Sequence, residues 1–122
     1  MYQIDVETLL TVNPRDGLYM CTNVVYLYAQ LLSTNSSGSE ALLGSLDQQS
    51  QVWADFGPLA TYDGVEGDFV KIIGEWNAHR SLVMLKIEPS DPKTLLDPTS
   101  QRRIAKCIKL MLKMARIRAQ SQ

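Results

Sequence analysis

The chain has 122 residues, of which 45% are hydrophobic and 20% are charged, and its formal net charge is −1. This length and composition fit one globular domain with its own core, and they argue against a disordered chain. The N-terminus shows no secretory signal, and the longest near-apolar run, residues 24–32, is too short to span a bilayer, so we expect a single cytoplasmic domain over residues 1–122.

The first half of the chain contains two segments with apolar residues at helical spacing. They cover residues 18–33 and 40–56. A polar, serine-rich stretch at residues 33–39 separates them, and Gly57 and Pro58 follow the second one. We therefore predict two helices, about residues 18–33 and 40–56, that form the core of the domain.

Residues 68–88 fit two structures. Two apolar, partly β-branched runs at 68–76 and 81–88 flank a polar stretch, which is typical of a hairpin. The apolar residues of the first run also have helical spacing. Because Pro89 ends the second run, we predict a β-hairpin near residues 68–88 and keep a helix as the alternative.

The end of the chain carries a specific helix-start signal. Asp97 is a good N-cap residue, and Pro98 suits the first helical position. We predict a helix from there to about residue 119. The expected fold is α+β and mainly helical, with three main helices at about residues 18–33, 40–56 and 98–119 and one hairpin.

Charge is segregated along the sequence. Residues 98–122 hold seven basic residues and no acidic one, for +7, whereas residues 1–97 hold five basic residues and all 13 acidic ones, for −8. Five cations would line one face of the last helix, opposite most of its apolar residues. These five residues, named the basic stripe below, are Arg102, Lys106, Lys109, Lys113 and Arg116.

The basic stripe requires an anionic counterpart, because like charges one turn apart destabilise a helix by about 0.2–0.5 kcal/mol per pair. Solvent, the acidic remainder of the domain, an acidic protein or a polyanion could supply it. The −8 of residues 1–97 and the lack of aromatic residues in the stripe make nucleic acid the less favoured counterpart. We expect a partner-binding surface that combines the basic stripe with exposed apolar side chains near Trp53 and Trp76.

The sequence contains no recognisable catalytic or metal-binding motif. Its one histidine, His79, falls in a predicted turn, and nucleotide-binding and nucleophile-elbow patterns are missing. The acidic residues Asp63, Glu66 and Asp68 do not follow the order of a calcium-binding loop. We expect a protein that is not an enzyme and that binds no metal and no cofactor.

One segment resembles a known family. Residues 66–75, which read Glu-Gly-Asp-Phe-Val-Lys-Ile-Ile-Gly-Glu, are similar to part of IcmW, the small acidic adaptor of type IVB secretion systems. The order of the elements around this segment, with paired helices before it and a basic helix after it, is also similar. The resemblance implies a chaperone-like adaptor that pairs with a sister adaptor, docks on a coupling ATPase and recruits effector proteins.

Three functions follow from these observations. The first is a non-enzymatic, protein-binding adaptor or chaperone of the kind found in secretion systems. It would engage acidic or apolar surfaces of another protein, or of copies of itself, as a hetero- or homo-oligomer. A structural subunit of a larger assembly, such as a virion, is the first alternative, and a nucleic-acid-binding protein is the second.

Overall fold

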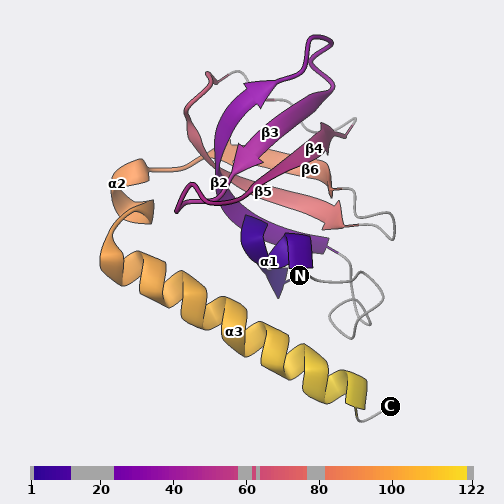
Figure 1. The fold of residues 1–122 in the computed structure, drawn as a ribbon, viewed down its shortest axis with the longest axis vertical. Coiled ribbons are helices and arrows are strands. Elements are labelled where there is room, and N and C mark those ends of the chain that lie inside the picture. The colour runs from indigo at the N-terminus through magenta and orange to yellow at the C-terminus, as the bar shows by residue number, and fades with distance from the viewer. Residues whose placement is uncertain (1, 12–23, 58–61, 63, 77–81, 121–122) are drawn as a thin grey trace.

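In the computed structural model, the described residues are 2–11, 24–57, 62, 64–76 and 82–120 (Figure 1). Five strands form a barrel, and a short strand and three helices lie outside it. The elements are β1 (Tyr2–Gln3), α1 (Val6–Thr11), β2 (Val24–Thr34), β3 (Glu40–Gly44), β4 (Gln51–Phe56), β5 (Phe69–Trp76), β6 (Leu82–Pro89), α2 (Pro92–Leu95) and α3 (Pro98–Gln120).

The barrel closes through one parallel pairing. β2, β3 and β4 pair antiparallel in sequence, and β5 pairs antiparallel with both β2 and β6. β4 and β6 then run parallel, with Ala54 beside Leu82. The circular order β2-β3-β4-β6-β5 is that of the OB fold, a five-stranded Greek-key barrel.

The close approach of β4 and β6 continues at the residue after β4. The N–H of Gly57 donates a hydrogen bond to the carbonyl oxygen of Met84 over 3.1 Å. A Cβ atom at position 57 would lie 2.5 Å from that oxygen, closer than real Cβ contacts come. Glycine therefore lets the end of β4 follow β6 and complete the barrel wall.

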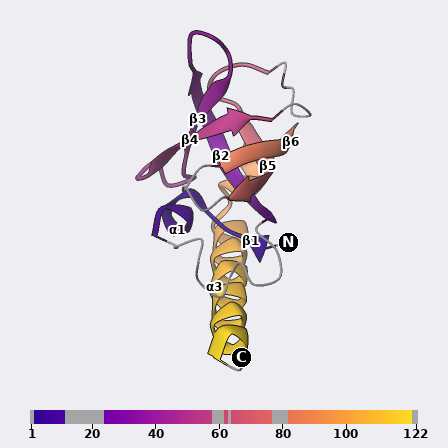
Figure 2. The same ribbon diagram turned by 90° about the vertical axis from the view of Figure 1, so that its right-hand side faces the viewer.

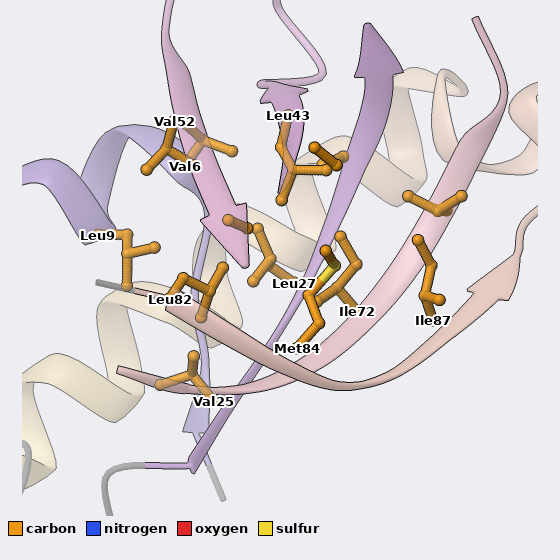
Figure 3. Close-up of a cluster of buried hydrophobic side chains, with 14 of the residues drawn as sticks. Val6, Leu9, Val25, Leu27, Leu43, Val52, Ile72, Leu82, Met84 and Ile87 are labelled. Atoms are coloured by element: carbon orange, nitrogen blue, oxygen red, sulfur yellow. The ribbon is translucent and has the colours of Figure 1, made fainter. Parts of the chain in front are cut away.

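The core fills the barrel interior. Strand side chains point alternately to the two faces of a sheet, and β2 alternates partly exposed and buried residues from Val24 to Leu31. Figure 3 shows Leu27, Ile72 and Met84 meeting from three different strands, and all three are fully buried. The side chains between the buried ones point to the outer surface, part of which is covered by β1, α1 and α3.

The predicted helices at residues 18–33 and 40–56 are wrong, and the fold is not mainly helical. β2 occupies the described part of the first range, and β3, a turn and β4 occupy the second. Nearly every residue from Val24 to Leu32 is apolar, so helical spacing and strand alternation fit this run equally well. In the described part of these two ranges, strands stand where the resemblance to IcmW implies paired helices.

Two other predicted elements are confirmed. β5 and β6 pair antiparallel, as expected for a hairpin near residues 68–88, although its connecting residues 77–81 lie outside the described part of the chain. α3 begins where the sequence predicts, because the Asp97 carboxylate accepts hydrogen bonds from the N–H groups of Thr99 and Ser100 at 3.1 and 3.2 Å.

α3 lies along the outside of the barrel next to β1 and then projects beyond it (Figures 1 and 2). Its buried side is held by Ile108, which is 4% exposed, with Ile104 and Cys107 half-buried beside it. A helix of 23 residues is about 34 Å long, so the barrel covers only part of it. None of the described helices has the length and apolar character needed to cross a bilayer.

The barrel core provides a direct test of the fold. Leu27→Ala removes a fully buried side chain from the barrel and should lower the free energy of unfolding by about 2–5 kcal/mol in urea denaturation. Leu110→Ala, the same change at a side chain that is 57% exposed, should alter it by less than about 0.5 kcal/mol. Equal effects of the two changes would contradict this core.

Candidate functional site

The outer surface of the β3–β4 hairpin presents one large aromatic side chain. Trp53 lies on β4 opposite Leu42 of β3, and 49% of its surface is exposed. Its neighbours in β4, Val52 and Ala54, point into the barrel, so strand alternation directs Trp53 outward. The outward residues of these two strands, named the hairpin face below, are Glu40, Leu42, Gln51, Trp53 and Asp55.

Two carboxyl groups stand next to each other on the hairpin face. Glu40 of β3 lies opposite Asp55 of β4. Asp55 raises the pKa of Glu40 above its ordinary value, because protonated Glu40 can donate a hydrogen bond to the Asp55 carboxylate; desolvation and the charge of Asp55 act in the same direction. Neither β3 nor β4 contains Lys or Arg. The face therefore offers an apolar aromatic surface edged by negative charge.

The turn before β3 is fixed by hydrogen bonds. The Asn35 side chain accepts the N–H of Glu40 at 3.0 Å and donates to the hydroxyl of Ser39 at 3.0 Å. Gly38 has a φ of +71°, a region that suits glycine, and its N–H bonds to the Asn35 carbonyl. The turn thus holds exposed hydroxyl groups in place at the edge of the hairpin face.

The basic stripe is exposed along α3, as the sequence predicts. Arg102, Lys106, Lys109 and Lys113 are exposed, and within the described residues no ion pair involves any of them. The side chain of Arg116 lies outside the described set. The stripe is therefore not neutralised by carboxylates of the described barrel, and what it binds stays a prediction.

Trp76 does not belong to an exposed surface, so that expectation is wrong. It is 1% exposed and ends β5 with its side chain inside the barrel. Its Nε1 has no hydrogen-bond partner among the described residues. Of the two tryptophans predicted to be exposed, Trp53 alone is available to a partner in this structure.

α3 also carries a line of exposed apolar side chains that sequence analysis missed. Leu110, Met114 and Ile117 are 57%, 53% and 56% exposed. They are spaced four and three residues apart, so they share one helix face, and they are named the apolar stripe below. Leu112 in the same stretch packs against the barrel core, so the apolar stripe is exposed because it lies on the side of α3 that faces away from the barrel.

A cavity of about 180 Å³ connects the hairpin with α3. Ser45 and Asp47 from the β3–β4 turn line it, together with Gln101 and Ile104 of α3. A hydrogen bond from the Ser45 hydroxyl lowers the pKa of Asp47, which keeps this carboxylate charged. Within the described ranges, no three His, Cys, Asp or Glu residues are grouped to hold a metal ion.

No protein-family model matches this chain, and no curated protein matches its sequence. Several solved structures are similar in fold. The telomere capping protein Ten1 from S. pombe aligns with a TM-score of 0.61 and 15% identity, over 85% of this chain and 93% of that one.

Two structures of Replication protein A are also similar. The one from U. maydis, bound to ssDNA, has a TM-score of 0.57 and 18% identity, over 86% of this chain and 90% of that one. A Replication Protein A heterotrimer bound to ssDNA has a TM-score of 0.63 and 10% identity, over 92% of this chain and 95% of that one. Identities this low show a shared fold alone.

The barrel and its structural neighbours correct the predicted function. The adaptor or chaperone prediction rested on the basic stripe, exposed apolar side chains and the resemblance to IcmW, whereas the chain is an OB barrel whose structural neighbours include ssDNA-bound proteins. The adaptor prediction and the statement that nucleic acid is less favoured are therefore wrong. The nucleic-acid-binding alternative agrees better with the fold, and the sequence resemblance to IcmW stays untested.

The carboxyl pair predicts a pH-dependent stability. Because the pKa of Glu40 is raised in the folded state, its contribution is favourable below its ordinary value of 4.5 and is lost as the pH rises through the raised value. Glu40→Gln should therefore be at least as stable as the parent at pH 7, and this advantage should vanish near pH 4.

Urea denaturation at both pH values measures this change. Glu66→Gln, which removes one charge from an exposed turn, serves as the matched control. A Glu40→Gln protein that is less stable than the parent at pH 7 would contradict a repulsive pair.

Proposed function

We propose that this domain binds single-stranded nucleic acid, with a base stacked on Trp53 of the hairpin face. The observation that carries the proposal is a half-exposed tryptophan on the second and third strands of the barrel, the surface with which OB folds bind oligonucleotides. Aromatic side chains on such surfaces stack bases of any sequence. The ssDNA-bound neighbours support a single strand as the ligand.

The composition of the hairpin face sets the orientation of the strand. Trp53 and Leu42 give apolar surface to a base, whereas Glu40 and Asp55 repel phosphates. The bases should therefore face the barrel, with the phosphates directed away from it. The same carboxylates can accept hydrogen bonds from base amino groups, as Glu and Asp do with cytosine.

We also propose that the domain acts inside the cell by binding alone, without catalysis, and as a subunit of an assembly. The apolar stripe of α3 supports an assembly, because three large side chains aligned on one helix face are typical of a helix that packs against another. Residues 98–122 contain no acidic residue, so two copies of α3 side by side would repel each other. A helix of another chain that lacks this basic stripe would therefore fit the apolar stripe better than a second copy of α3.

Replacement of the aromatic surface tests nucleic-acid binding. Trp53→Ala should weaken binding of an oligothymidylate of about 16 nucleotides by about 1–3 kcal/mol, because one base loses its stacking partner. Fluorescence anisotropy of a labelled oligonucleotide measures this loss. Trp53→Phe should retain most of the affinity.

Val65→Ala is the control for this experiment, since it removes an apolar side chain that is 68% exposed and lies in the turn before β5, outside the hairpin face. The proposal fails if Trp53→Ala binds the oligonucleotide as tightly as the parent protein does.

The proposed assembly has its own test. Leu110→Ser combined with Met114→Ser removes two members of the apolar stripe and should reduce the mass of the protein isolated from its native cells to that of the free chain. Light scattering after size-exclusion chromatography gives this mass. Val65→Ser is the matched exposed control, and an unchanged complex in the double variant would rule out this surface.

A further inference from the structure

The hairpin face lacks the cations that a nucleic-acid site needs. Much of the affinity for a polyanion comes from Lys and Arg side chains that neutralise phosphates and release counterions. β3 and β4 contain neither residue, and the face carries Glu40 and Asp55 instead. The electrostatic part of binding must therefore come from another part of the molecule.

Two barrel lysines already have interactions within the domain. The ammonium group of Lys71 lies 5.1 Å from the centre of the Tyr26 ring, and that of Lys86 pairs with the Glu88 carboxylate at 2.7 Å. Both lie on the β5–β6 side of the barrel, not on β3 or β4. They are therefore poor candidates for the missing cations.

The basic stripe is a better candidate for the missing cations than these two lysines. Its members from Arg102 to Lys113 are exposed, stand about one turn apart, and have no ion pair to a carboxylate of the described residues. Together these cations extend over about 16 Å of helix. Residues 98–122 contain no acidic residue that would weaken their field.

α3 adjoins the hairpin at one end. The β3–β4 turn and the first part of α3 line the same cavity, so a strand that leaves the hairpin face past this turn meets α3. Asp5, Glu7 and Asp47 also line this cavity and would repel phosphates there. The exposed side of α3, which leads away from the barrel (Figures 1 and 2), is the attractive route.

The acidic barrel does not cancel this attraction. Residues 1–97 carry −8, but exposed charges farther apart than about 8 Å are largely screened at physiological salt. Lys109 and Lys113 are exposed on α3, whose C-terminal end projects beyond the barrel (Figure 2), so they act on a phosphate beside the helix more strongly than the more distant barrel carboxylates do.

We propose that the basic stripe of α3 is a second contact surface for nucleic acid, which binds the phosphates of the same strand whose bases lie on the hairpin face. This inference rests on the proposed function and names the source of its electrostatic affinity. Lysine side chains are flexible point charges, so they can follow a phosphate backbone without a fixed spacing. The stripe contains no aromatic residue, so its contacts position the strand and do not read its sequence.

The salt dependence of binding tests this inference. Lys109→Gln combined with Lys113→Gln should lower the slope of log affinity against log salt concentration by about 1.4, because each phosphate contact on a single strand contributes about 0.7. Anisotropy titrations of an oligothymidylate of about 16 nucleotides over a salt series give the slope. Urea denaturation checks that the variant, changed at exposed positions, stays folded.

The matched control is Lys93→Gln combined with Arg103→Gln. It also removes two exposed cations, one from α2 and one from α3 outside the basic stripe. This control should keep the parent slope, whereas Trp53→Ala should lower the affinity at every salt concentration without changing the slope.

Each proposal fails in a recognisable way. If the Lys109 and Lys113 variant keeps the parent slope while Trp53→Ala weakens binding, the proposed function stands, and the stripe serves another anionic surface such as an acidic protein. Equal slope losses in this variant and its control would also overturn the inference, since they indicate a general effect of net charge. If Trp53→Ala has no effect and the slope still falls, the basic stripe binds phosphates but the hairpin face does not bind the bases, so the proposed function and the inference of one strand shared by both surfaces fail together.

Discussion

The pairing of β4 with β6 determines which side chains of this domain are available to a ligand. Because Ala54, Asp55 and Phe56 stand beside Leu82, Val83 and Met84, the register of β4 is fixed relative to the barrel interior. A shift by one residue would turn Trp53 inward and expose Val52 and Ala54, since neighbouring residues of a strand point to opposite faces. The candidate site therefore depends on a contact between segments about 28 residues apart in sequence.

Charge and apolar surface are divided between two parts of the molecule. The hairpin face combines Trp53 with the carboxyl pair Glu40 and Asp55, and the exposed cations of the basic stripe lie on α3. In the proposed function, base stacking and phosphate neutralisation have separate locations, which would let an OB barrel with an acidic body bind a polyanion. The apolar stripe of α3 borders the basic stripe, since Leu110 and Ile117 follow Lys106 and Lys113 by four residues, so a subunit that packs on it would lie beside the proposed strand.

Local sequence signals were sufficient to predict α3 and the β5–β6 hairpin. The Asp97 cap and the β-branched runs around residues 77–81 act within a few residues of the elements they specify. The run from Val24 to Leu32 is different, because continuous apolar sequence fits a helix and a strand equally, and the barrel partners of β2 decide the outcome. The polar residues 47–50 between β3 and β4 were a turn signal that the helical interpretation passed over.

The same dependence on distant pairing limits what the sequence alone predicts about the two tryptophans. Alternation groups Trp53 with the polar residues Gln51 and Asp55, and Trp76 with the apolar residues Val70 and Ile72. This signal applies only to strands, and distant pairing decides that both segments are strands. Their difference in exposure also makes the two tryptophans suitable reporters. Nuclear magnetic resonance of the two indole N–H signals during titration with single-stranded DNA tests the central claim most directly. A large shift of the Trp53 signal with a nearly constant Trp76 signal is the predicted result, and a Trp53 signal that does not move while DNA binds would contradict the account.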